Sequence, residues 1–313
     1  MWAAGTFVIR IDSAISSVKI IDCHTHCYPP ELTSNPTDWA ISQGELHWAK
    51  LVAPADKPSI QGWATMKQML TAMDSAGIEK SVLLGWYWEN EATCRWHNEV
   101  IANWVKTEPE RFIGFAAIHP GVSSKKVLEQ CEHALNIGLK GVGELHPGIQ
   151  QFSASSEGWK TLAEWCTLNH WPINIHATEA VGKNHSGNIP TPLQDFLDMA
   201  RNSPQLKLIL AHWGGGLAFF ELNPALRKSL KNVYYDTAAT PLLYEPSIFR
   251  HIIEIVGANK VLFGSDYPLK VYPKKQKRPD FTTFLNSIRD NTNLTSEDYT
   301  AIMHRNLQTL LEP

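Results

Sequence analysis

The sequence predicts a single (β/α)8 barrel, and two observations predict it. Short β-branched or apolar runs alternate with helical stretches along the chain, and such alternation builds a parallel sheet because each crossover needs a helix. Eight strand–helix units can be counted, which is the number in this barrel. The 313 residues suit one barrel domain over 1–313. A doubly wound open sheet is the alternative, but "DCHTHC" is not the Gly-rich turn expected after its first strand.

The elements follow from these runs in chain order. The predicted strands are 18–24, 80–86, 111–119, 138–146, 171–177, 206–212, 232–238 and 260–266. The predicted helices are 63–76, 95–107, 124–136, 157–169, 191–202, 217–230 and 246–256, followed by 280–290 and 296–311. The long excursion from Tyr28 to Gly62 follows the first strand. Because loops after barrel strands lie on the catalytic face, we expect this segment to be a substrate lid.

Composition narrows the class of protein. The net charge of −3 and the pI of about 6.5 argue against a nucleic-acid surface or a polybasic membrane anchor. Five dispersed cysteines suit free thiols in a reducing compartment. The apolar opening "MWAAGTFVI" is too short for a membrane span and lacks the charged start of a signal peptide. We therefore expect a cytoplasmic enzyme with a small-molecule substrate; a homo-oligomer is compatible with this expectation.

The first strand ends in two histidines one residue apart, His24 and His26. Residues two apart in a strand point to the same face, about 6.6 Å apart along its axis. Two imidazoles at that spacing can lean onto one metal ion, or they can be a structural pair at the edge of a strand. The neighbours Cys23 and Cys27 are expected to face the other side.

Other strands also end in residues that can bind metal. Barrel active sites lie at the C-terminal ends of the strands. The fourth strand ends near Glu144, the fifth in His176, the sixth in His212 and the eighth in Asp266. Five such ends converging on one barrel mouth predict a metal site.

The segments "DCHTH", "INIHATE", "LILAHWGGG" and "VLFGSDYP" resemble the metal-dependent amidohydrolase superfamily. Within it, the chain is similar to the amidohydrolase-related branch, which includes aminocarboxymuconate-semialdehyde decarboxylase and related lyases. The resemblance spans roughly Lys19 to Leu311. It implies that four residues bind a divalent metal, zinc in most members, and that His212 binds a second metal or hydrogen-bonds the reactive water. The four implied ligands are His24, His26, His176 and Asp266.

The fourth strand departs from the pattern of that superfamily. Many members with two metals have a carboxylated lysine there, whereas this strand reads "GVGELHP" and offers Glu144. Glu144 could bind or bridge one or two ions, or pair with a cation at the barrel rim. His146 shares its face by alternation and stays a candidate.

Two enzymatic functions fit these residues. In a hydrolase of amide, ester, lactone or similar bonds, metal-bound water is activated, Asp266 moves its proton and His212 stabilises the oxyanion or positions the water. In a lyase, the same ligands would support non-oxidative decarboxylation or hydration of a small carboxylic acid. A lyase would need a cation for the carboxylate, and Arg95, Lys183 and Arg250 are its possible sources. The sequence places the hydrolase first, and a metal-binding protein without activity is a third class.

Overall fold

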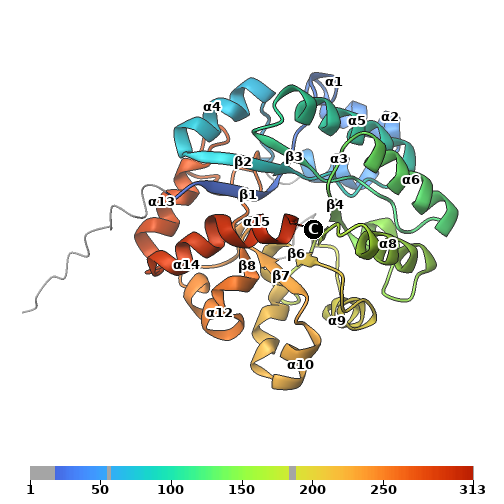
Figure 1. The fold of residues 1–313 in the computed structure, drawn as a ribbon. Helices are drawn as coiled ribbons and strands as arrows, with labels where there is room; N and C mark the ends of the chain where they lie inside the picture. Colours follow the sequence, from blue (N-terminus) through green and yellow to red (C-terminus); the bar gives the residue numbers. More distant parts are fainter. Residues whose placement is uncertain (1–17, 55–57, 183–187, 313) are drawn as a thin grey trace, which may run out of the picture.

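Eight short parallel strands form the centre of the computed structural model, which describes residues 18–54, 58–182 and 188–312. Helices surround the strands on the outside (Figure 1). The strands are β1 (Ile20–Thr25), β2 (Ile78–Leu83), β3 (Phe112–Gly114), β4 (Val142–Leu145), β5 (Ile173–Ile175), β6 (Leu208–Leu210), β7 (Val233–Asp236) and β8 (Val261–Leu262).

The strands close on themselves in sequence order. Two parallel sheets, β1-β2-β3 and β4-β5-β6-β7-β8, are joined by parallel bridges between Ala116 and Val142 and between Thr25 and Tyr267. The second bridge lies on the seam between the first and last strands, where Cys23 N donates to Phe263 O at 2.8 Å. The predicted (β/α)8 barrel is therefore confirmed. Most strands are shorter than predicted, because the ladders end before the apolar runs do: Phe115 follows the last residue of β3, and Phe263 follows the last residue of β8.

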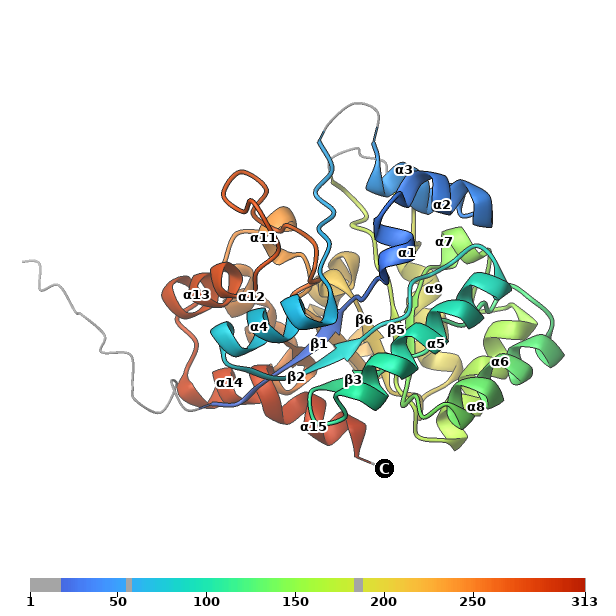
Figure 2. The same ribbon diagram turned by 90° about the horizontal axis from the view of Figure 1, so that it is seen from above.

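The inside of the barrel is filled by apolar side chains from opposite walls. Val82, Ile209 and Leu262 pack in one cluster although their strands are far apart in sequence. Leu307 and Leu310 of α15 (Asn306–Leu311) join the same cluster. Figure 2 shows α15 on the side of the barrel opposite to α1–α3. The helix thus closes the N-terminal end of the barrel, and the C-terminal ends of the strands face the other side.

The main crossover helices lie close to their predicted positions. They are α4 (Met66–Ala76), α5 (Glu91–Thr107), α6 (Ser124–Asn136), α8 (Glu157–Leu168), α9 (Leu193–Asn202), α12 (Ile248–Val256) and α13 (Thr282–Asn291). Helix α4 shows why: Thr65 and Gln68 form a reciprocal capping box at its start, and Gly77 ends it in a left-handed conformation.

Two predicted helices are divided in the structure. The stretch 217–230 becomes the end of η2 (His212–Leu222) followed by α10 (Pro224–Ser229). The stretch 296–311 is α14 (Ser296–Thr300), the π-helical η4 (Ala301–Arg305) and α15. Short elements that were not predicted are α7 (Pro147–Gln150), α11 (Thr240–Leu243) and η3 (Ala258–Lys260).

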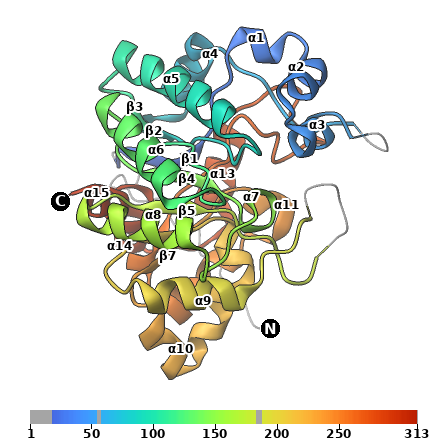
Figure 3. The same ribbon diagram turned by 90° about the vertical axis from the view of Figure 1, so that its right-hand side faces the viewer.

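The segment after β1 covers the C-terminal side of the barrel. It contains α1 (Pro30–Thr33), α2 (Pro36–Gln43) and α3 (Leu46–Val52), and Figure 3 shows these helices on the side away from α15. Its tryptophans pack onto the loop after β2: the ring centroids of Trp39 and Trp48 lie 5.5 and 5.6 Å from that of Trp88. We call residues 28–54 the cap segment.

A buried carboxylate fastens the cap segment to the barrel. Glu45 accepts hydrogen bonds from the backbone N–H groups of Glu89 and Asn90, at 2.7 and 3.2 Å, and from the Asn90 amide at 3.1 Å. In return, Glu89 Oε2 accepts from His47 N at 2.7 Å. The cap is thus held to the loop after β2 from both sides. Across the described ranges, the helices all fall short of the length and apolarity that a bilayer span requires.

Candidate metal centre

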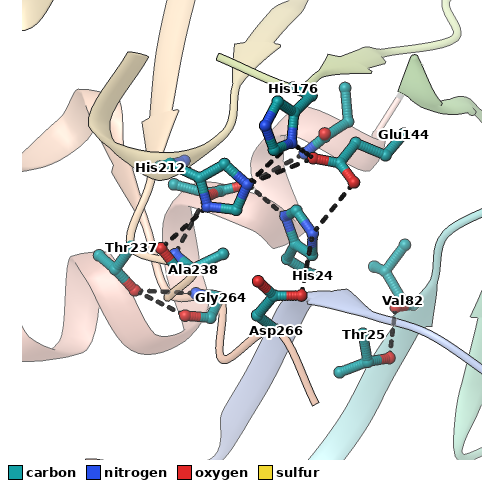
Figure 4. A network of polar contacts seen from close by, with 12 residues as sticks. His24, Thr25, Val82, Glu144, His176, His212, Thr237, Ala238, Gly264 and Asp266 are labelled. Atoms are coloured by element: carbon teal, nitrogen blue, oxygen red, sulfur yellow. Dashed lines mark hydrogen bonds and ion pairs between the residues drawn. The ribbon is translucent and has the colours of Figure 1, made fainter. Parts of the chain in front are cut away.

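The predicted site residues come together at the C-terminal mouth of the barrel (Figure 4). His24 and Glu144 belong to β1 and β4. His176 directly follows β5, whereas His212 comes two residues after β6 and Asp266 four residues after β8. All but His176 are buried. The convergence expected from the strand ends is what the structure shows.

Four of these residues surround one point. The Nε2 atoms of His24 and His26 each lie 3.8 Å from Glu144 Oε2, and 3.8 and 3.6 Å respectively from Asp266 Oδ1. Ligand atoms about 2.1 Å from a shared ion are separated by no more than roughly 4.2 Å. These four atoms therefore have the spacing of a shell around one cation. We call His24, His26, Glu144 and Asp266 the four-residue group.

The contacts of His24 show that this group favours a positive charge at its centre. His24 Nδ1 lies 2.8 Å from a carboxylate oxygen of Asp236, so Nδ1 carries a proton and Nε2 is the nitrogen that faces the centre. Nε2 has no hydrogen-bond partner among the described residues and faces the oxygens of Glu144 and Asp266. Burial would lower the pKa of His24, but Asp236 and then Glu144 raise it to about 9. The carboxylates thus favour a positive charge at Nε2, which either a proton or a metal ion can supply, so these residues fit a divalent metal.

A second cluster shares Glu144 with the first. Glu144 Oε1 lies 2.8 Å from His176 Nδ1 and 3.4 Å from His212 Nε2, and the two imidazole nitrogens are 3.2 Å apart. We call Glu144, His176 and His212 the three-residue group. The structure places His176 here, against Glu144 and His212. Glu144 thus turns one oxygen to each group, as a bridging carboxylate does.

The charges of the two groups are coupled. Burial would raise the pKa of Glu144, but His176 and His24 hold it well below its usual range. Burial would lower the pKa of His212, but the hydrogen bond and the charge of Glu144 raise it to about 10. His212 Nδ1 donates to Ala238 O at 3.1 Å. Its Nε2 is therefore the atom left for a proton, a metal or a substrate.

The two cysteines beside the histidines stay outside these groups. Cys23 packs in the cluster inside the barrel and Cys27 in the layer between strands and helices. Among the described residues, the groupings that could hold a metal contain His, Glu and Asp but no cysteine. The pairing of β1 with β2 is irregular between Asp22 and Thr25. The side chains at this end of β1 therefore do not alternate strictly between the two faces of the strand.

Asp236 at the end of β7 is the important residue that the sequence analysis missed. Its Oδ2 accepts from His24 Nδ1 at 2.8 Å and from Asn174 Nδ2 at 3.0 Å, and its Oδ1 accepts from the backbone N–H of His212 at 3.0 Å. Burial would raise its pKa, but His24 lowers it. The sequence does contain a pattern that could have identified Asp236: a lone carboxylate ends the apolar run "NVYYD", as Asp266 follows the apolar run before it.

A left-handed turn positions His212. Residues 212–216 all have positive φ, from 56° to 96°. A Cβ on Gly214 would come within 2.8 Å of the Tyr235 ring, and one on Gly215 within 2.4 Å of Thr178 O. Glycine is thus needed at 214 and 215 for this tight turn.

Aromatic rings flank the metal ligands on the side of the cap. The Trp86 ring lies 5.2 Å from that of His26, edge-on, and the Tyr28 ring stacks on His26 at 6.3 Å. Tyr87 lies 5.4 Å from His176. Trp213, in contrast, is fully buried and donates from its indole nitrogen to Thr240 Oγ1 at 2.9 Å. It therefore belongs to the core.

The expected sources of a carboxylate-binding cation are not found at the site. Arg95 is exposed on α5. Arg250 is exposed on α12 and pairs with Glu254 at 2.5 Å. The prediction that either arginine faces the site is wrong, because each lies on the outer face of its helix. Lys183 lies outside the described residues.

Comparison with known proteins identifies relatives of this chain. The family model described as "Amidohydrolase" matches residues 21–310. A 2-amino-3-carboxymuconate-6-semialdehyde decarboxylase of Dictyostelium discoideum is 22% identical over 202 residues, 55% of this chain and 55% of that relative. A 6-methylsalicylic acid decarboxylase of Penicillium expansum is 23% identical over 293 residues, 79% of this chain and 84% of that relative. The match thus spans about half of the first relative's length and most of the second's.

Solved structures support the fold. A 5-carboxyvanillate decarboxylase from Sphingomonas paucimobilis has a TM-score of 0.69 at 16% identity, covering 94% of this chain and 99% of that one. A dihydroxybenzoic acid decarboxylase from Polaromonas sp. JS666, solved with manganese and 2-nitroresorcinol, has a TM-score of 0.65 at 18% identity, covering 94% and 97%. With the family match over nearly the whole chain, and with the barrel and its cluster of histidines and carboxylates in place, this protein belongs to the amidohydrolase family.

Proposed function

We propose that this protein is a divalent-metal-dependent, non-oxidative decarboxylase of a small carboxylic acid. The observation that carries the proposal is the alignment with 6-methylsalicylic acid decarboxylase over 79% of this chain. The relative from Dictyostelium discoideum is also named as a decarboxylase. Their shared activity favours the lyase over the hydrolase that the sequence placed first, although the residues of the site suit both reactions.

The metal ligands in this proposal are the residues predicted from the sequence. His24, His26 and Asp266 would hold an ion from β1 and the segment after β8, with Glu144 reaching it through Oε2. His176 and His212, which contact Glu144 Oε1, would hold a second ion or orient the substrate. A mixed set of imidazole and carboxylate ligands suits zinc and also manganese. The bound ion would supply the positive charge that holds the carboxylate of the substrate, a charge that neither Arg95 nor Arg250 supplies.

The chain's own residues account for the proton in the reaction. Decarboxylation breaks the bond to the carboxylate carbon, releases carbon dioxide and leaves an electron pair on the substrate, which must take up a proton. Asp266 is the proposed donor: its side chain is 12% exposed at the mouth of the site, where it can take up a proton from water and pass it to the substrate, while Glu144 is enclosed. His212 Nε2 is the alternative donor, facing the same space. The aromatic rings of Trp86 and Tyr87 would exclude water and pack against a flat acid.

Metal analysis followed by a substrate panel tests the proposal. The purified protein should contain zinc or manganese, and it should release carbon dioxide from at least one aromatic or unsaturated carboxylic acid. Asp266→Asn should lower that turnover by about 10²–10⁴-fold while the fold survives, because it keeps the size of the side chain but removes the acid. Asp198→Asn, an acid on the surface of α9, is the matched control. Hydrolysis of an ester, lactone or amide without release of carbon dioxide would contradict the proposal.

A further inference from the structure

The sequence contains the same tripeptide, His-Pro-Gly, after two neighbouring strands. It occurs at 119–121 after β3 and at 146–148 after β4. In both copies the histidine Nδ1 accepts a hydrogen bond at 3.2 Å from the backbone N–H of the glycine two residues on. A nitrogen that accepts from an N–H group carries no proton, so both imidazoles are neutral and carry their proton on Nε2.

The two copies differ in the hydrogen-bond partners available to the imidazole. The His119 imidazole also has a hydrogen bond with the backbone of Glu89. His146 is fully buried, and its Nε2 finds no hydrogen-bond partner among residues 18–54, 58–182 and 188–312. A buried donor without a partner is destabilising. The tripeptide after β4 thus presents a donor that no described group of the protein uses.

The position of this donor links it to the candidate metal centre. The His146 ring stacks on His176 with 4.8 Å between centroids and 12° between planes. Tyr87 packs against it edge-on at 4.9 Å. His176 in turn contacts Glu144 and is 18% exposed. The His146 ring therefore packs directly on the imidazole that contacts the carboxylate shared by the two groups.

The cap segment brings a second imidazole to the same place. The His47 ring on α3 lies 6.4 Å from that of His146 and 6.2 Å from that of Tyr87. Its Nε2 is also buried without a partner among the described residues. The hydrogen bond from His47 N to Glu89 Oε2 holds this residue in place. Two imidazole rings, one from the barrel and one from the cap, thus border the same region.

We infer that His146, assisted by His47, is a specificity-determining residue whose Nε2–H donates to a second oxygen of the substrate, separate from the group held at the metal centre. A neutral donor beside Glu144 favours a neutral acceptor, such as a hydroxyl or carbonyl oxygen, because a second buried anion would be repelled there. The inference rests on the proposed function only in assuming that the acid group of the substrate lies at the metal centre.

Binding of simple probes to the metal-loaded full-length protein tests this inference without turnover. Benzoate, 3-hydroxybenzoate and 4-hydroxybenzoate differ in a hydroxyl group that is too far from the carboxylate to share its metal ligand. Calorimetry should show that the wild type binds one of the hydroxybenzoates about 3- to 10-fold more tightly than benzoate, as one added hydrogen bond predicts.

The variants isolate the donor. His146→Asn keeps a residue that can cap α7 but shortens the reach, and it should abolish the preference for the hydroxyl while the affinity for benzoate changes less than about twofold. His47→Phe should reduce the preference. His119→Asn, which removes the matched tripeptide histidine, should leave it unchanged. If His146→Asn fails to fold by circular dichroism, His146→Ser provides the same test.

Two outcomes overturn the inference: equal affinity of the wild type for all three probes, or a preference that survives in the His146 variant. Neither outcome depends on decarboxylation. A protein that prefers a hydroxybenzoate but releases no carbon dioxide from any acid would contradict the proposed function and leave the role of His146 standing.

Discussion

Single residues decide how the candidate metal centre is built, and Asp236 illustrates this best. It holds the Nδ1 proton of His24 and the backbone N–H of His212, so it orients one residue of each group. A carboxylate that hydrogen-bonds a metal-binding histidine fixes its tautomer and raises its basicity. For His24, this contact leaves Nε2 to face the centre; for His212, the hydrogen bond from Nδ1 to Ala238 O at 3.1 Å does the same.

Replacing Asp236 should therefore weaken metal binding without removing a ligand. We expect Asp236→Asn to lower the metal affinity by about 10- to 100-fold, since its amide cannot accept all the hydrogen bonds of the carboxylate. Competition with a chromophoric chelator measures this change. Asp198→Asn serves again as the control. An unchanged affinity in a folded Asp236 variant would mean that Asn174 and the backbone are enough to orient His24.

Glu144 carries a second prediction at this scale. If its two oxygens bridge two ions about 3.5–4 Å apart, Glu144→Gln should reduce the metal content from about two ions per chain to one. Elemental analysis of the wild type and the variant gives the answer. One ion per chain in the wild type would show that Glu144 does not bridge two ions, and Glu144 would then be a ligand or partner of a single ion.

The residues at the strand ends could be predicted from the sequence because the barrel fixes where strand ends lie. Their pairwise contacts could not be predicted. That His176 turns to Glu144 and His212, and that Asp236 reaches His24, depends on how different strands of the barrel are staggered, and β1 and β7 are about two hundred residues apart in sequence. The outward direction of Arg95 and Arg250 likewise follows from helix packing, which short polar stretches do not reveal.

At the scale of elements, the cap segment is the part that sequence patterns described least. The sequence predicted a lid-like excursion but none of α1–α3, because helices of four to eight residues are too short to show an apolar period or to be stable alone. They are ordered by packing: Trp39 and Trp48 lie against Trp88. The main crossover helices were predicted well because each has a buried face of its own.

Glu45 gives a test of how the cap is held. Glu45→Ala removes three hydrogen bonds between α2–α3 and the loop after β2, each worth about 1.5–3 kcal/mol when the acceptor is charged. We expect hydrogen exchange to accelerate in residues 46–52 while β1 and β2 keep their protection. Glu31 is an exposed acid of α1, and Glu31→Ala should leave the hydrogen exchange of residues 46–52 unchanged. Acceleration spread evenly over the barrel would instead mean that Glu45 supports the whole fold.

At the scale of the whole molecule, stability should depend on acid through a buried histidine. His97 accepts on Nδ1 from Trp88 Nε1 at 3.0 Å, and its Nε2 donates to Cys27 O at 2.9 Å. Burial lowers its pKa to about 4 from 6.5. Because the folded protein binds this proton more weakly than the unfolded chain, the contribution of His97 is complete above pH 6.5 and is lost as the pH falls toward 4.

This difference in pKa corresponds to roughly 3 kcal/mol of unfolding free energy. Urea unfolding of metal-free wild type and His97→Gln at several pH values between 7 and 4 measures it. The variant shares every other titrating group, so the wild type should lose about that much more stability than the variant over this range. Parallel pH curves for the two proteins would show that His97 is not protonated on unfolding.

The barrel as a whole was predictable from the count and alternation of its strands, which even the two-residue β8 did not obscure. The closure of the barrel was harder to predict from the sequence, because two of the eight contacts between neighbouring strands are isolated bridges rather than full ladders. One of these bridges joins Thr25 to Tyr267, and near it Asp266 N donates to His24 O at 2.9 Å. The candidate metal centre therefore lies on the seam of the barrel.

That seam has a consequence for the order of events during synthesis. His24 and His26 are made more than two hundred residues before Asp266. At about 5–20 residues per second, the two histidines wait on the order of tens of seconds for the carboxylate that would complete a shell around one ion. Until then the nascent chain offers only part of the proposed coordination, so we expect firm metal loading only after Asp266 has been made.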